Sequence, residues 1–215
     1  MSYPILYSFR RCPYAMRARL AIFSAELKHE HREILLKEKP KAFLDLSSKG
    51  TVPVLLTENN KLIEESLDIM KWALKKNDPE KLLDIESEKH FSRFISKLDN
   101  DFKTNLDNYK YLHKEYETKL ICRNNACEFL QQLDVQLNNQ KWLFGESPKI
   151  YDLASLPFIR QFANVDRSWF DNQPFKNIHR WLNSFLDSNR FFSIMHKYKK
   201  WSPTDTPNLN DFEKS

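Results

Sequence analysis

The order of strand-like and helical patterns over residues 1–76 restricts the fold of this chain more than any other feature. The short apolar runs and amphipathic stretches that set this order are residues 4–9, 13–25, 31–36, 40–46, 52–56, 62–63 and 66–75. They form a βαβ unit, a short helix and a ββα unit. A βαβ unit makes a parallel, right-handed crossover, and two strands joined by a tight turn make an antiparallel hairpin. We predict a four-stranded α/β domain with helices on both faces.

The pattern changes after a polar stretch at 77–84 that contains Pro79 and reads as a linker. Apolar side chains then recur at helical spacing, as in Phe91, Ile95 and Leu98, without a convincing strand pattern. We therefore predict an all-α domain over 85–201. Residues 202–215 contain two prolines and little to bury, which predicts a mobile or surface-lying tail.

Composition excludes several classes of function. The 215 residues include only two glycines, which rules out a glycine-rich phosphate loop or a dinucleotide fingerprint. The net charge of +5 is spread along the chain, so we expect no nucleic-acid partner. No apolar run reaches the ~18–20 residues that cross a bilayer, so we expect no membrane partner. Without a visible secretory signal, we expect a reducing cytoplasm, where a cysteine is catalytic or simply buried.

Cys12 is the sharpest chemical feature. It lies between a strand and a helix that begins at Pro13, and Arg10 and Arg11 precede it. Unpaired N–H groups at a helix start favour thiolate over thiol, so we expect a lowered pKa. A dithiol oxidoreductase would carry a second cysteine at position 15, which is Ala15 here. This favours a monothiol mechanism, in which an external thiol resolves a mixed disulfide.

Two other segments are candidates for binding a peptide-like ligand. A cis bond between Val52 and Pro53 would turn the Val52 backbone outward, where it can pair with an amide, although most X-Pro bonds are trans. Glu65 and Ser66 precede a helix. Ser66 is either only an N-cap or a donor to a carboxylate, and Glu65 can accept from an ammonium group. An amino-acid end group needs both.

These residues carry a family resemblance. Over 6–72 the chain resembles the thioredoxin-like domain of the glutathione transferases, and within them it is most similar to the cysteine-type, omega-like class. The matching runs are Tyr7-Ser8, Arg10 to Ala15, Arg17 to Leu20, Leu36 to Pro40, Gly50 to Leu55 and Leu62 to Ser66. The helical part matches less closely. It carries Asp152, Leu153, Ala154 and Pro157 of a buried capping-box helix, but Lys149 stands where the family has Ser or Thr, so half of the box is missing.

The resemblance implies a glutathione site in a thioredoxin-like domain joined to an all-α domain. Cys12 would form the mixed disulfide, and Tyr14 would line the site beside the sulfur. Lys39 would meet the glycine carboxylate, and Val52, followed by Pro53, would pair with the cysteinyl backbone. Glu65 and Ser66 would hold the γ-glutamyl group. No metal is expected, and glutathione is the cosubstrate.

The implied activity is glutathione-dependent thiol transfer or reduction, including deglutathionylation or reduction of dehydroascorbate. The partner would be a small electrophile or disulfide, and the family suggests a homodimer. The alternative is a binding or regulatory protein of this fold that lacks catalysis, for example one associated with the transcription machinery. The retained set of Cys12, Lys39 and Glu65-Ser66 argues against it, because a scaffold has no use for all of them.

Weaker candidates have structural interpretations. Tyr7 resembles the hydroxyl that activates glutathione in tyrosine-type relatives, but a tyrosine within a strand is more often core. His29 and His31 are expected on a solvent-facing turn. Cys122 and Cys127 lack partners at zinc spacing, so we expect buried helix cysteines.

Overall fold

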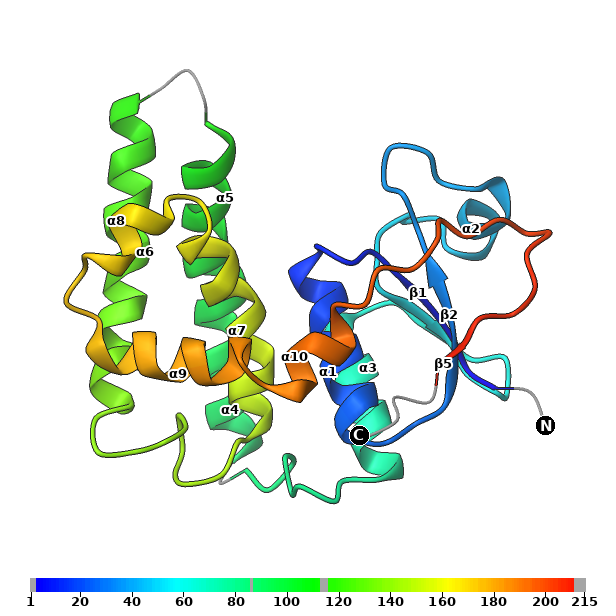
Figure 1. The fold of residues 1–215 in the computed structure, drawn as a ribbon, viewed down its shortest axis with the longest axis horizontal. Coiled ribbons are helices and arrows are strands. Elements are labelled where there is room, and N and C mark those ends of the chain that lie inside the picture. The colour runs from blue at the N-terminus through cyan, green and yellow to red at the C-terminus, as the bar shows by residue number, and fades with distance from the viewer. Residues whose placement is uncertain (1–2, 86, 113–115, 211–215) are drawn as a thin grey trace. The chain divides into compact units, whose positions relative to one another are not determined.

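The computed structural model describes residues 3–85, 87–112 and 116–210. The chain divides into two compact units (Figure 1). One contains residues 3–80 together with 188–210, and the other covers 81–187. The first boundary lies within the predicted linker, whereas the second lies well before the predicted end of the helical domain.

The N-terminal unit has the predicted α/β architecture. Its elements are β1 (Ile5–Ser8), α1 (Pro13–Ser24), β2 (His29–Glu33), α2 (Lys41–Leu46), β3 (Val54–Leu56), β4 (Leu62–Ile63), α3 (Ser66–Lys76), α10 (Asn189–Ile194) and β5 (Leu209–Asn210). The strand order is β4-β3-β1-β2-β5. β1 is parallel to β2 and antiparallel to β3, and β3 is antiparallel to β4. The βαβ and hairpin predictions are confirmed.

Strand alternation places the helices on opposite faces of this sheet. Neighbouring side chains of a strand point to opposite faces. The Tyr7 ring packs on Phe43 of α2 at a centroid distance of 5.2 Å, while the adjacent Ser8 contacts Arg19 of α1. α1 also packs against α3 and α10. Its small residues Ala15 and Ala18 are fully buried, as expected for a helix in close contact with its neighbours.

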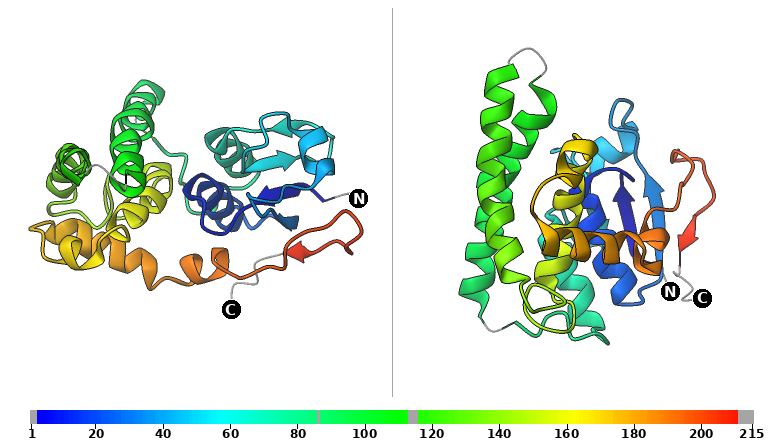
Figure 2. Two further views of the ribbon diagram at one scale, coloured as in Figure 1. Left: turned by 90° about the horizontal axis from the view of Figure 1, so that it is seen from above. Right: turned by 60° about the vertical axis from the view of Figure 1, so that its left-hand side comes forward.

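Residues 188–210, which we call the C-terminal segment, correct the sequence-based prediction. They belong with the N-terminal unit, and β5 pairs antiparallel with β2 (Figure 2). The Trp201 amide donates to the Glu33 carbonyl at 2.8 Å, and the His31 amide donates to the Asn208 carbonyl at 2.8 Å. An edge strand exposes unpaired N–H and C=O groups, and this segment satisfies those of β2. The described part of the expected tail is therefore hydrogen-bonded to the sheet.

The same arrangement explains a second correction. His29 and His31 are 0% and 2% exposed, rather than on a solvent-facing turn. Both belong to β2, and the Tyr198 ring stacks on His31 at 3.9 Å. Burial is the main cause that lowers the pKa of both histidines, that of His29 to about 3. They are neutral at pH 7.

The regular elements of the second unit, among its described residues, are all helical. It contains α4 (Glu88–Ser96), a π-helical turn η1 (Lys97–Phe102), α5 (Lys103–Tyr111), α6 (Tyr116–Gln136), α7 (Ile150–Ala163), α8 (Arg167–Asp171) and α9 (Lys176–Leu186). Within the ranges that the structure describes, no helix has both the length and the apolar character needed to cross a bilayer.

Asp152 organises the start of the buried helix α7. Its carboxylate accepts from the Lys149 amide at 2.9 Å, the Leu143 amide at 3.0 Å and Trp181 Nε1 at 2.9 Å. The Lys149 ammonium has no acceptor atom for the Asp152 amide and donates to Asp84 instead. Only half of a capping box is therefore formed, as predicted. Burial raises the pKa of Asp152 to about 6, against the opposing effect of its three donors.

Candidate active site around Cys12

Cys12 occupies the N-cap position of α1. Its backbone is extended, with φ −73° and ψ 122°, and Pro13 is the first helical residue. Proline suits this position because its missing N–H would have no helical partner. The thiol is half-buried and donates to the Val52 carbonyl at an Sγ to O distance of 3.6 Å. The sulfur therefore lies at the helix start, beside the backbone predicted to pair with a cysteinyl group.

One short segment, residues 49–53, contacts all three parts of the predicted site. Val52 meets Cys12, and the Val52-Pro53 peptide bond is cis. Gly50 has φ +58°, and the Lys39 side chain lies against it, with Nζ 3.6 Å from the position of a Cβ on that glycine. Lys49 donates to Glu65 at 2.8 Å. The structure thus links Cys12, Lys39 and Glu65 through this segment, which we call the 49–53 segment.

Glu65 and Ser66 lie at the start of α3, but Glu65 rather than Ser66 holds the N-cap position. Glu65 is the N-cap residue, without a side-chain capping bond, and its side chain is 68% exposed. Ser66 is the first helical residue and is 6% exposed. A groove of about 510 Å³ runs along this helix start, lined among others by Lys49, Glu65 and Asp68. Both acidic and basic groups are thus available for a zwitterionic end group.

Tyr14 and Lys39 keep positions compatible with ligand contact. Tyr14 follows Pro13 in the first turn of α1, is partly exposed, and lies under the Arg17 guanidinium at 5.4 Å. Lys39 is exposed on the loop before α2. An exposed ammonium is suited to a ligand carboxylate, although water screens such a pair.

Tyr7 belongs to the core. Its ring is 3% exposed and packs edge-on against Trp201 at 5.5 Å. Its hydroxyl accepts from Arg32 at 2.5 Å, and burial is the main cause that raises its pKa. A phenol in this environment stays protonated at pH 7.

Sequence reasoning missed two residues of this region. Lys49 precedes Gly50 in a loop and carries no pattern that pairs it with Glu65. Arg19 is a charged residue in a helix, which ordinarily indicates a solvated face, yet it is 1% exposed. The signal available for Arg19 was its position on the small-residue face of α1, which is expected to be buried, because a buried charge needs hydrogen-bond partners. Among the residues described, His, Cys, Asp and Glu side chains form no group of three able to hold a metal.

Family models match both parts of the chain. Residues 6–81 match the family model of the glutathione S-transferase N-terminal domain, and residues 69–189 match that of the C-terminal domain. The chain is 27% identical over 163 residues to glutathione S-transferase omega-1 of Mus musculus, covering 75% of this chain and 68% of that protein. It is 39% identical over 62 residues to omega-2 of Homo sapiens, covering 29% of this chain and 26% of that protein.

Solved structures share the fold at low identity. A glutathione transferase family member from Pseudomonas fluorescens, with two glutathione bound, has a TM-score of 0.78 at 16% identity and covers 90% of this chain and 92% of that chain. Glutathione transferase Omega 3C from Trametes versicolor has a TM-score of 0.76 at 15% identity and covers 93% and 91%. The chain therefore belongs to the glutathione S-transferase family and is an omega-like member of it.

Proposed function

We propose that this protein is a glutathione-dependent thiol transferase and reductase that acts through a mixed disulfide at Cys12. The observation that carries the proposal is the half-buried thiol at the start of α1, 3.6 Å from the Val52 carbonyl. A helix start favours the thiolate, and the thiolate is the nucleophile in disulfide exchange. Cys122 and Cys127, on α6, have no such position, and burial raises the pKa of Cys127 to about 11.

The proposed reaction has two exchange steps. The Cys12 thiolate attacks the glutathionyl sulfur of a mixed disulfide, forms a Cys12–glutathione disulfide and releases the other sulfur as a thiolate, which takes a proton from water. The thiolate of a second glutathione then attacks the glutathionyl sulfur on Cys12. Glutathione disulfide leaves, and the Cys12 thiolate is regenerated. The missing second thiol at Ala15 requires this external step.

We assign the peptide contacts of glutathione to the 49–53 segment and the start of α3. Lys39 meets the glycine carboxylate, the backbone of Val52 beside Pro53 pairs with the cysteinyl group, and Tyr14 lies beside the sulfur. Glu65 and Ser66 receive the γ-glutamyl end. The glutathione-bound relative of the same fold supports glutathione as the ligand. We further propose a cytoplasmic homodimer and a small disulfide, or an oxidised molecule such as dehydroascorbate, as second substrate.

The test measures reduction of a glutathionylated small thiol by wild type, Cys12→Ser and Cys122→Ser. We expect loss of activity only in Cys12→Ser, and mass spectrometry of the wild type without free glutathione should show one glutathionyl group on Cys12. Equal activity in wild type and Cys12→Ser contradicts the mechanism. Glutathione binding by calorimetry without turnover of any substrate would favour the alternative, a binding or regulatory protein of this fold.

A further inference from the structure

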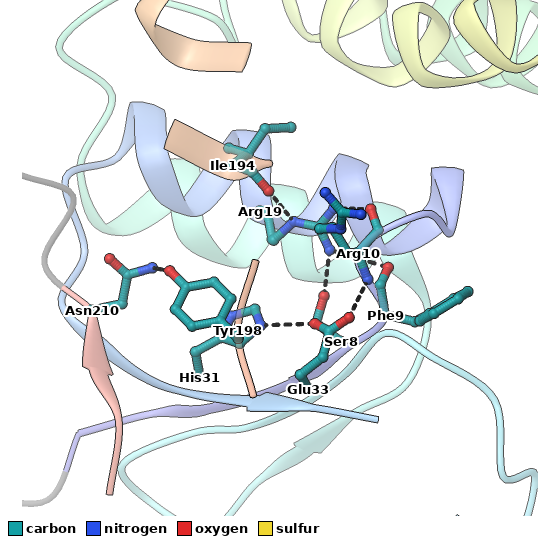
Figure 3. Close-up of polar contacts among 9 residues, drawn as sticks. All are labelled: Ser8, Phe9, Arg10, Arg19, His31, Glu33, Ile194, Tyr198 and Asn210. Atoms are coloured by element: carbon teal, nitrogen blue, oxygen red, sulfur yellow. Dashed lines mark hydrogen bonds and ion pairs between the residues drawn. The ribbon is translucent and has the colours of Figure 1, made fainter. Parts of the chain in front are cut away.

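Arg19 is a buried charge held by the turn that carries Cys12. Its guanidinium donates to Ser8 Oγ at 2.5 Å, to the Phe9 carbonyl at 3.3 Å and to the Arg10 carbonyl at 2.7 Å (Figure 3). The Phe9 carbonyl also accepts from the Cys12 amide at 3.0 Å. Residues 8–12, which we call the Cys12 turn, are therefore fixed from inside by a planar fork of donors, which a lysine cannot reproduce.

The fourth acceptor of Arg19 lies far away in the sequence. Its Nε donates to the carbonyl of Ile194, at the end of α10, at 2.8 Å. The C-terminal segment reaches the same cluster through Tyr198, which stacks on His31 and contacts Asn210. His31 Nε2 lies 3.2 Å from one Glu33 carboxylate oxygen, and the other accepts from the Arg10 amide at 2.6 Å. Arg19 and Glu33 thus tie the C-terminal segment to the Cys12 turn.

Burial of the Arg19 charge carries a desolvation cost. Burying a guanidinium requires that its donors be paired and its charge be balanced. The charged and titratable groups that act on Arg19 are Glu33 of β2, Cys12 and Arg10 of the Cys12 turn, and Tyr198 of the C-terminal segment. A negative charge on Cys12 stabilises the guanidinium. By reciprocity the guanidinium stabilises the Cys12 thiolate.

We propose that Arg19 is a positioning residue for Cys12: it holds the Cys12 turn in the reactive shape and makes that shape depend on the docked C-terminal segment. The proposal rests on the proposed role of Cys12 as the reactive thiol and adds the groups that prepare it. It assigns the C-terminal segment a part in the site through the Ile194 carbonyl.

The test uses the full chain with Cys122→Ser and Cys127→Ser, so that iodoacetamide modifies only Cys12. Arg19→Met removes the charge and the donors, Arg19→Lys keeps only the charge, and Arg32→Met removes another partly buried cation of the same unit that pairs with Glu30 and Tyr7. We measure alkylation rate against pH, and amide hydrogen exchange of the peptide that contains the Cys12 turn.

We expect Arg19→Met to raise the midpoint of the alkylation profile by about one pH unit. Arg19→Lys should shift it by less than half as much, but both variants should exchange the Cys12 amide several-fold faster. Arg32→Met should change neither readout. If Arg19→Met does not fold, as judged by circular dichroism, Arg19→Lys and Ser8→Ala still test the turn through amide exchange.

A folded Arg19 variant with wild-type alkylation and exchange overturns the proposal. Neither readout needs glutathione or turnover, so the result is separate from the proposed function. If Cys12→Ser retained thiol transfer, the mechanism would fail, while the effect of Arg19 on the Cys12 turn would still be decided by exchange.

Discussion

The Lys49 ammonium lies 2.8 Å from a carboxylate oxygen of Glu65, the residue assigned to the γ-glutamyl ammonium. The Glu65 hydrogen bond is the main cause that raises the pKa of Lys49, so Lys49 stays charged. If Glu65 binds the γ-glutamyl ammonium as proposed, that ammonium and Lys49 compete for one exposed carboxylate.

This competition predicts opposite effects of two substitutions on glutathione affinity. Glu65→Ala should weaken binding about fivefold, because the ligand ammonium loses its counter-charge. Lys49→Met should tighten binding about twofold, because Glu65 becomes free. Calorimetric titration in a Cys12→Ala background separates binding from disulfide formation. Lys39→Ala serves as the comparison at the other end of the ligand, with an expected loss below about threefold. Weaker binding in Lys49→Met would show that Lys49 contacts the ligand itself.

The three cysteines should differ sharply in reactivity. Burial raises the pKa of Cys127 to about 11, and Cys122 is buried, whereas Cys12 is half-buried at a helix start. Brief treatment with limiting iodoacetamide at pH 7 should label Cys12 at least tenfold faster than either helical cysteine, as measured by peptide mapping. The urea-unfolded protein is the control, in which all three rates should converge. Preferential labelling of Cys127 in the native protein would contradict this.

Asp152 should make stability depend on pH. The ordinary pKa of an aspartate is about 3.8, and burial raises that of Asp152 to about 6, so between these values the folded chain binds more protons than the unfolded chain. Stability is therefore lost as pH rises through this window, by roughly 3 kcal/mol from this group. Asn does not titrate, so Asp152→Asn, destabilised at any pH, should differ more from wild type at pH 4 than at pH 7. Urea unfolding at both pH values measures this, and a larger difference at pH 7 would refute the assignment.

Trp201 should anchor the C-terminal segment to the sheet. Its ring packs on Tyr7 at 5.5 Å and lies under the Arg32 guanidinium at 4.5 Å. Trp201→Ala should lower the free energy of unfolding by about 2 kcal/mol, below the range for a fully buried tryptophan because the ring is partly exposed. Phe192→Ala, whose ring is 62% exposed, is the matched control and should have little effect. Denaturant unfolding compares them, and equal stabilities of the two variants would exclude an anchoring role.

The N-terminal elements and the candidate thiol could be predicted because their signals are local. Strand alternation, the small-residue face of α1 and the strand–Cys-Pro–helix order each depend on residues within one or two turns of one another. The family resemblance supplied the predicted ligand contacts of Tyr14 and Lys39, which no local pattern indicates. Boundaries shifted by up to three residues, as at β2, because strand ends depend on pairing partners.

The sequence by itself determined the order of elements, the two-part organisation and the position of Cys12 at a helix start, because each follows from nearest-neighbour patterning. Tertiary structure alone decided that residues 188–210 return to β2, that His31 and Arg19 are buried and that Lys49 pairs with Glu65. A two-residue strand has no period to read, and a charged side chain reads as exposed until its partners are known. The Ile194 carbonyl that accepts from Arg19 lies 175 residues further along the chain, so no local pattern could have predicted the pair.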